Sequence, residues 1–192
     1  MKPGGVFLIL LVLAIIAGIV VWAISRAQRL FRAQYAALIL VAKARGFRFV
    51  DDPDPDVRIR MDGVVDGITV HVRARVLRGV RRADPVLEVQ ALGHAMPRQG
   101  VVIKRKGALG DELVAEGTEA DSVQGALNSR AFQRAMAAAT EPVWAGTSGE
   151  GWMDHEGVSI RKGGYQGNPD VISQMIDRAV EACRVYQETE LG

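Results

Sequence analysis

The sequence predicts an α+β fold, in which an N-terminal transmembrane helix precedes a mainly antiparallel sheet packed with two or three helices. Three observations predict it. Residues 6–24 contain no charged side chain, Asp66-Gly67 separates two stretches of alternating apolar and polar residues, and an amphipathic segment follows Asn168. The chain is therefore divided into a tail and transmembrane helix at 1–25, a juxtamembrane helix at 26–46 and a single α+β domain at 47–192.

The apolar segment at 6–24 is long enough to cross a bilayer. As a helix, its nineteen residues rise about 28 Å, close to a hydrocarbon thickness of about 30 Å. Phe7 and Trp22 lie near its ends, where aromatic rings are enriched. The alternative is a signal peptide cleaved near Ala23 and Ser25. The long apolar core and the arginine-rich helix after it favour an uncleaved anchor, so we expect residues 6–24 to contact the lipid bilayer.

Basic residues follow the apolar segment and hardly precede it. Lys2 is the single charged side chain before residue 6, whereas Arg26, Arg29 and Arg32 come soon after residue 24. No acidic residue occurs before Asp51. Because basic flanks stay on the cytoplasmic side, we expect the domain in the cytoplasm. The alternative is a domain on the outer or periplasmic side, since a short N-terminal tail determines orientation weakly.

The transmembrane helix is expected to continue without a break. Residues 26–45 contain no Gly or Pro and are rich in helix-forming residues, and Gly46 supplies a stop. One face at helical spacing consists of Phe31, Tyr35, Leu38 and Ala42, with Leu30, Gln34 and Val41 beside it. We predict that this face packs on the domain. The alternative is that it lies among the lipid headgroups.

A β-hairpin is the clearest element of the domain. Asp66-Gly67 favours a two-residue type I′ turn between strands at 57–65 and 68–78. The second strand alternates apolar and polar residues, as in an antiparallel sheet covered on one face. Before the hairpin, a short strand FRFV at 47–50 leads into a turn-rich connector, DDPDPD at 51–56. Further strands are predicted at 86–92, 101–106, 108–116 and 157–161.

Two helical regions complete the fold. The first spans 121–139, where Asn128-Ser129 breaks the pattern into two pieces. The second begins after Asn168, a good N-cap, with Pro169 at the first helical position. Its apolar face is formed by Ile172, Met175, Ile176, Ala179, Cys183 and Tyr186. This spacing predicts an amphipathic helix packed on a core.

The net charge of +2 conceals an uneven distribution. Residues 26–106 contain 17 Lys and Arg against 8 Asp and Glu, whereas residues 107–192 contain 6 against 14. Such a split suggests a membrane surface or nucleic acid as partner, unless the two halves neutralise each other within the fold. With Cys183 as the single cysteine, no intramolecular disulfide is possible, which fits a reducing compartment.

We find no residue pattern that predicts catalysis, a metal or a cofactor. His71, His94 and His155 are far apart and belong to no metal-binding motif. Cys183 lies on the predicted buried face, and Ser148 has no nucleophile-elbow context. The glycine-rich stretches at 107–113 and 163–169 lack the spacing of a phosphate-binding loop. No catalytic, cofactor-binding or metal-binding residue is therefore assigned.

Basic residues gather on the predicted hairpin. A two-residue turn at Asp66-Gly67 places Val65 opposite Ile68. The same register places Arg60 opposite Arg73, Arg58 opposite Arg75 and Asp62 opposite His71. Like charges in such positions are unfavourable. Either Glu88 and the Asp residues at 51–56 offset them internally, or the arginines face an anionic surface. The candidate contacts with anionic lipid headgroups are Arg26, Arg29, Arg32, Arg58, Arg60, Arg73 and Arg75.

Three classes of function remain for such a chain. The first is a membrane-tethered, non-enzymatic interaction or scaffold domain with a protein partner or a self-association interface, neither of which the sequence identifies. The second is a small-molecule or lipid-binding domain at the membrane surface, which requires an apolar cavity with a few polar groups. The third is an enzyme, which requires a histidine to meet Asp or Glu in the fold. Nucleic acid is not expected, because no aromatic residues interleave with the basic ones.

Overall fold

The computed structural model describes residues 3–78, 83–94, 97, 99–105, 113–139 and 150–191, and all structural statements below concern these residues. The helices are α1 (Pro3–Arg45), α2 (Ala120–Leu127), α3 (Arg130–Ala139) and α4 (Pro169–Leu191). The strands are β1 (Arg48–Val50), β2 (Val57–Val65), β3 (Ile68–Arg78), β4 (Ala83–Leu92), β5 (Val101–Arg105), β6 (Leu113–Glu116), β7 (Glu150–Asp154) and β8 (Gly157–Gly163). This is the α+β arrangement that the sequence predicts.

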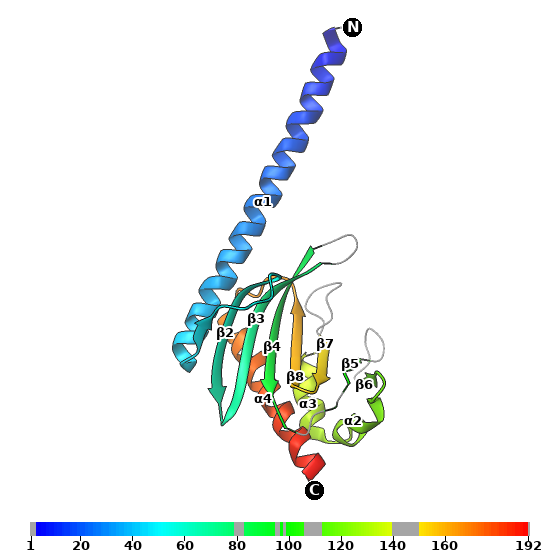
Figure 1. Ribbon diagram of the computed structural model, residues 1–192. Coiled ribbons are helices and arrows are strands. Elements are labelled where there is room, and N and C mark those ends of the chain that lie inside the picture. Colours follow the sequence, from blue (N-terminus) through cyan, green and yellow to red (C-terminus); the bar gives the residue numbers. More distant parts are fainter. Residues whose placement is uncertain are drawn as a thin grey trace.

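The eight described strands form one antiparallel sheet in the order β1-β2-β3-β4-β8-β7-β5-β6. Figure 1 shows α4 running across one face of this sheet, with α3 beside it. The residues between sheet and helices are apolar and almost fully buried, among them Met61, Val72, Val89, Ile160 and Phe132. Because strand side chains alternate between faces, the neighbouring residues on β2, β3 and β4 point away from the helices.

The hairpin forms as the sequence predicts. Asp66 and Gly67 have φ angles of 50° and 82°, as a type I′ turn requires, and Val65 lies opposite Ile68. The register shifts near the far end of β2, where Val57 faces Arg75 and Ile59 faces Ala74. One extra residue therefore stands in β2 at this point, a β-bulge.

The structure corrects several predicted boundaries. β4 begins at Ala83 rather than 86, and β6 covers only the last four residues of the predicted strand at 108–116, whose first part lies outside the described residues. The sequence analysis missed β7, because its glycine-rich start looks like a loop. β7 and β8 form a hairpin joined by His155-Glu156, in which Glu156 and Gly157 donate backbone hydrogen bonds to Asp154 Oδ1 (3.0 and 3.3 Å).

The later helices agree with the sequence. α2 and α3 are separated at Asn128-Ser129, as predicted. α4 begins at Pro169, and the backbone N–H of Asp170 donates to Asn168 Oδ1 at 2.9 Å, so Asn168 caps the helix. The predicted apolar face of α4 is entirely buried, with exposed fractions of 0–3 %: Ile172, Met175, Ile176, Ala179, Cys183 and Tyr186.

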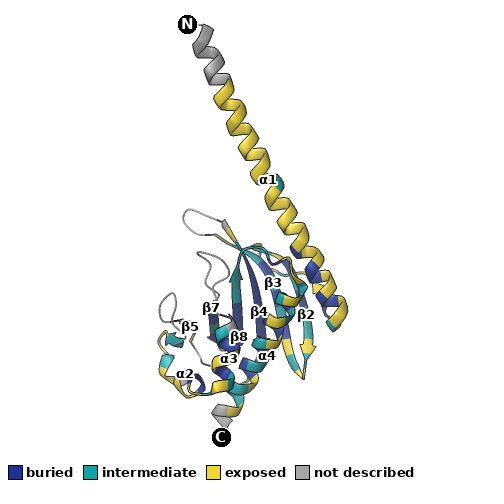
Figure 2. Cartoon of the chain, turned by 180° about the vertical axis from the view of Figure 1, so that it is seen from behind, coloured by how far each residue is buried: buried dark blue, intermediate teal, exposed yellow. Residues whose placement is uncertain are grey.

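The helix α1 is continuous from Pro3 to Arg45 and projects far beyond the domain (Figure 1). By length and composition it is able to cross a membrane, with a mean hydropathy of 2.0 over its most apolar window, none of which is buried. From Leu11 onward, Figure 2 shows buried residues of α1 only at the end next to the domain. Gly46, with φ of 71°, ends the helix.

The face of α1 that packs on the domain differs from the prediction. Leu38 and Ala42 are buried, but Phe31 and Tyr35 are 37 % and 46 % exposed. The buried set is Gln34, Ala37, Leu38, Val41 and Ala42, rotated toward one side of the predicted stripe. α1 is further fixed to α4 where Arg45 donates two hydrogen bonds to the Asp177 carboxylate, at 2.6 and 2.8 Å. The small side chains of Ala37 and Ala42 allow α1 to approach the domain closely.

We expect Leu38→Ala to lower the free energy of unfolding by roughly 2–5 kcal/mol, because Leu38 is 1 % exposed and its loss leaves a cavity under α1. The measurement is urea denaturation of the full chain in mild detergent. Leu40→Ala is the matched control on the same helix: Leu40 is 57 % exposed, so its truncation should change stability by at most about 0.5 kcal/mol. Equal effects of the two substitutions would contradict this docking of α1.

Candidate functional site

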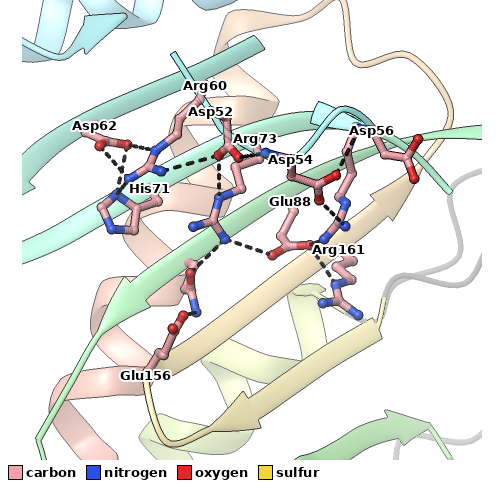
Figure 3. A network of polar contacts seen from close by, with 12 residues as sticks. Asp52, Asp54, Asp56, Arg60, Asp62, His71, Arg73, Glu88, Glu156 and Arg161 are labelled. Carbon is pink, nitrogen blue, oxygen red and sulfur yellow. Dashed lines mark hydrogen bonds and ion pairs between the residues drawn. The ribbon is translucent and has the colours of Figure 1, made fainter. Parts of the chain in front are cut away.

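The face of the sheet that points away from the helices carries a network of charged side chains (Figure 3). Its arginines are Arg60 on β2, Arg73 and Arg75 on β3 and Arg161 on β8, and its carboxylates are Asp52, Asp54, Asp62 and Glu88. These come from segments far apart in the sequence. Opposite charges therefore pair across this face, although the buried Nε atoms of Arg73 and Arg75 have no hydrogen-bond partner among the described residues. We take this face as the first candidate site.

Glu88 on β4 is the centre of the network. Its side chain is 3 % exposed, and three guanidinium groups surround it. Arg161 Nε lies 2.9 Å from Oε2, Arg75 Nη1 lies 3.4 Å from Oε2, and Arg73 Nη1 lies 3.6 Å from Oε1. A carboxylate this deeply buried is tolerated because opposite charges surround it.

The connector at 51–56 supplies two more carboxylates. Asp52 Oδ2 lies 3.3 Å from Arg60 Nη1 and 3.4 Å from Arg73 Nε, and Asp54 Oδ2 lies 2.9 Å from Arg75 Nη2. The chain is shaped for this by side-chain turns, since the backbone N–H of Asp54 donates to Asp52 Oδ1 at 2.9 Å. Asp52 and Asp54, which disfavour regular structure in the connector, thus also neutralise positive charge on the sheet.

Asp62 binds Arg60 and His71 together. The Nε and Nη2 atoms of Arg60 each donate to Asp62 at 2.8 Å, and His71 Nδ1 lies 2.8 Å from Asp62 Oδ1. Burial by itself raises the pKa of Asp62, but the hydrogen bond from Arg60 and the charge of His71 outweigh it and hold that pKa below its usual value. The same hydrogen bond raises the pKa of Arg60.

Two interpretations were open for the hairpin arginines: neutralisation by carboxylates of the domain, or contact with an anionic surface. The first applies to Arg60, Arg73 and Arg75, all of which have carboxylate partners. The predicted pairs Arg60–Arg73 and Asp62–His71 are confirmed. The predicted pair Arg58–Arg75 is wrong. The β-bulge places Val57 opposite Arg75 instead, a shift that the turn at the other end of the hairpin does not determine.

Arg58 therefore differs from the other hairpin arginines. It is exposed and forms no ion pair with any residue that the structure describes. It lies between two cavities and lines both. The first, about 400 Å³, adjoins β1 and is also lined by Tyr35, Phe49 and Val50. The second, about 360 Å³, lies between α1 and the sheet and is lined mainly by apolar groups.

Arg26, Arg29 and Arg32 are exposed along α1. The Arg26 guanidinium lies over the Trp22 ring, 5.3 Å from its centroid, and Arg29 Nε donates to the backbone oxygen of Ser25 at 3.4 Å. Within the described part of the chain, Arg26, Arg29 and Arg32 form no ion pair with an acidic side chain. Their charge is available to an external partner.

Among the histidines, His71 meets an acidic residue, Asp62, whereas His94 and His155 are exposed in turns. Cys183 is fully buried, and burial raises the pKa of its thiol to about 11, which makes it a poor nucleophile. Within the described ranges, no group of three His, Cys, Asp or Glu side chains is placed to hold a metal ion. Ser148 and most of 107–113 lie outside those ranges.

Sequence reasoning missed two parts of the candidate site. Arg161 joins Glu88 because β8 lies beside β4, a neighbour relation between segments 73 residues apart. Gln34 was placed beside an apolar stripe, yet it is 2 % exposed and lines the second cavity. The sequence offers one signal for Gln34, namely that a polar residue interrupts an apolar helix face.

Comparison with models of protein families, with curated proteins and with solved structures found no match. The function therefore has to be argued from the residues above.

We expect Glu88→Gln to lower the free energy of unfolding by roughly 3–5 kcal/mol, because it leaves three guanidinium groups around a neutral amide. Thermal and urea denaturation measure this. Glu116→Gln is the control, because the Glu116 side chain is 56 % exposed in its ion pair with Lys104 and should contribute at most about 1 kcal/mol. A Glu88→Gln protein as stable as the control variant would show that the network contributes little to the fold.

Proposed function

We propose that this chain is a single-pass membrane protein whose α+β domain is a non-enzymatic interaction or scaffold domain held at the cytoplasmic surface of the bilayer. One observation carries the proposal. The apolar part of α1 and the part packed on the domain form a single helix, with no linker between them. A domain attached in this way keeps a fixed position relative to its anchor.

The exposed apolar surface of α1 supports membrane insertion. Its large apolar side chains between Leu11 and Ile24 are 47–63 % exposed, which is the surface left on an isolated helix. A contiguous apolar surface of this extent is rare in contact with water. Burial of these side chains among lipid chains removes the free-energy cost of exposing them to water, and the helix satisfies its own backbone hydrogen bonds.

The position of the domain follows from the helix. Gln34, the first buried residue of the domain contact, lies ten positions after Ile24, so about 15 Å of helix lies between hydrocarbon and domain. Arg26, Arg29 and Arg32 occupy this interval, at the depth of the lipid headgroups. Each is expected to contribute up to about 1 kcal/mol in contact with an anionic membrane. These positive charges also favour the cytoplasmic side.

The outer edge of β1 is the surface that best fits a protein partner. β1 pairs with β2 on one side only, and Phe49 and Val50 are each 45 % exposed. Arg48 and Asp51, exposed at its two ends, form no ion pair with a described residue. An added antiparallel strand with an acidic residue opposite Arg48 and a basic one opposite Asp51 would complement this edge. We propose a strand of a second protein as its partner.

In cells, the full chain with Lys43→Cys should remain in the membrane pellet after alkaline extraction. A membrane-impermeant maleimide should label residue 43 only after permeabilisation, since Lys43 is exposed on the cytoplasmic side of the proposed span. Cys183, 0 % exposed, gives little background. Ala14→Arg with Ala17→Arg should release the protein, because each arginine near the helix centre costs about 2.5–3.5 kcal/mol.

Ala36→Arg with Ala44→Arg is the matched control, because both residues are exposed on the same helix but outside the apolar segment. This variant should stay in the pellet. Free solubility of the parent chain would contradict the span, and labelling in intact cells would contradict the cytoplasmic side.

A photo-crosslinker at Tyr35, whose ring centroid is 6.1 Å from that of Phe49, should yield one discrete adduct in native membranes. Phe49→Lys should abolish that adduct, because a lysine on an edge strand opposes pairing. Val64→Lys, at a 61 % exposed position of β2, should leave it intact. Formation of the adduct regardless of Phe49→Lys would contradict the β1 interface, and an adduct between two copies would identify self-association instead.

A further inference from the structure

The second cavity has the composition of a ligand site. Its volume of about 360 Å³ lies within the usual range for small-molecule sites, roughly 300–1,000 Å³. Apolar groups form most of its wall, namely Phe31 of α1, Ala74 and Val76 of β3, Pro85 of β4 and Tyr165. The Phe31 and Tyr165 rings pack edge to face, 6.3 Å apart, and join the helix to the sheet layer.

Two polar side chains that line the cavity have no partner among the described residues. Gln34 is 2 % exposed, and its amide makes no hydrogen bond to any residue that the structure describes. Arg58, at the cavity rim, likewise has no ion pair in that part of the chain. The other arginine of the lining, Arg75, pairs with Asp54 and Glu88 through its two Nη atoms, while its buried Nε has no hydrogen-bond partner among the described residues. Gln34 lines the cavity, so its amide is placed to form a hydrogen bond with a ligand there.

The bulge in β2 explains why Arg58 is available. In a regular strand, Arg58 would face Arg75 on the charged side of the sheet, where carboxylates are present. The extra residue removes Arg58 from that register. Arg58 lines both cavities, next to Arg60 in the first and Arg75 in the second. β-Bulges commonly redirect a side chain toward a site in this way.

The cavity lies close to the proposed membrane surface. Phe31 is seven residues beyond Ile24, the end of the apolar segment, or about 10 Å along the helix. Val76 pairs with Pro85 near the end of β3 and the start of β4. Figure 1 shows that this end of the two strands lies on the side toward which α1 projects. A lipid-derived molecule therefore has a short path from the bilayer to the cavity.

We propose that this cavity binds an amphiphile with one anionic head group and an aliphatic chain, taken from the membrane. The apolar wall holds the chain. The Arg58 guanidinium binds the carboxylate or phosphate of the head, and the Gln34 amide donates a hydrogen bond to the same group. The inference rests on the proposed membrane anchor for the source of the ligand, whereas the binding chemistry depends on the cavity alone.

The test uses the full chain in phosphatidylcholine nanodiscs that contain a small fraction of a palmitate analogue with a photoreactive diazirine in its chain. After irradiation, mass spectrometry locates the adducts. Adducts within residues 6–24 report contact with bulk lipid and serve as an internal reference. Adducts at Phe31, Val76 or Tyr165 report the cavity, and the ratio of cavity adducts to reference adducts is the measured quantity.

Arg58→Gln should reduce this ratio about tenfold, as expected for loss of a charge-assisted hydrogen bond. Arg134→Gln, which changes an exposed arginine of α3 outside both cavities, should leave it unchanged. Ala74→Met, which fills the cavity, should reduce it as well. A fatty alcohol of the same chain length should label the cavity about tenfold less than the palmitate analogue, since it lacks the charge.

A lysophosphatidate analogue distinguishes the head groups: stronger cavity labelling than with the palmitate analogue identifies a phosphate, and weaker labelling a carboxylate. Equal labelling by the fatty alcohol, no effect of Arg58→Gln, or no cavity adducts in the parent chain would each overturn the proposal. Cavity adducts without adducts in residues 6–24 would instead contradict the membrane anchor and leave the cavity site standing.

Discussion

The contact between α1 and the domain determines how the rest of the molecule is arranged. Leu38, Val41 and Ala42 are almost fully buried against the domain, and Arg45 forms a two-bond ion pair with Asp177 of α4. Since α1 has no interruption, this contact fixes the direction in which the apolar segment leaves the domain. α1 also lines both cavities beside Arg58, through Tyr35 in the first and through Phe31 and Gln34 in the second.

The charged network explains how the sheet keeps one face without helices. A sheet face left open to solvent normally carries separate polar side chains. Here Glu88, Gln90 and Ser159 on that face are buried, at 1–3 % exposure, beneath arginines that bridge four strands and the connector. The side chains form a polar layer over the sheet. Arg60, Arg73 and Arg75 are thereby paired with carboxylates of the domain. Of the seven arginines that the sequence suggests as lipid contacts, Arg58, Arg26, Arg29 and Arg32 have no ion pair with a described residue.

Local signals account for the parts of the fold that the sequence predicts well. The Asp66-Gly67 turn, the Asn168 cap and the periodicity of α4 each depend on neighbouring residues, and the structure confirms them. The predictions that failed depend on distant contacts. Phe31 and Tyr35 are exposed because the surface offered by α4 determines which side of α1 is buried. The bulge at Arg58 is an irregularity within the β2–β3 hairpin that the turn does not determine. The contact between Arg161 and Glu88 follows from strand order, which the residue pattern alone does not reveal.

The absence of a flexible joint in α1 has a mechanical consequence. Its 43 residues form a rod about 65 Å long, fixed to the domain at one end. A membrane helix longer than the local hydrocarbon thickness tilts to keep its apolar length in lipid. If α1 spans a bilayer as proposed, such a tilt would turn the whole domain by the same angle and would move β1 and Arg58 toward or away from the headgroups. Bilayer thickness would then set how far these two surfaces stand from the lipid.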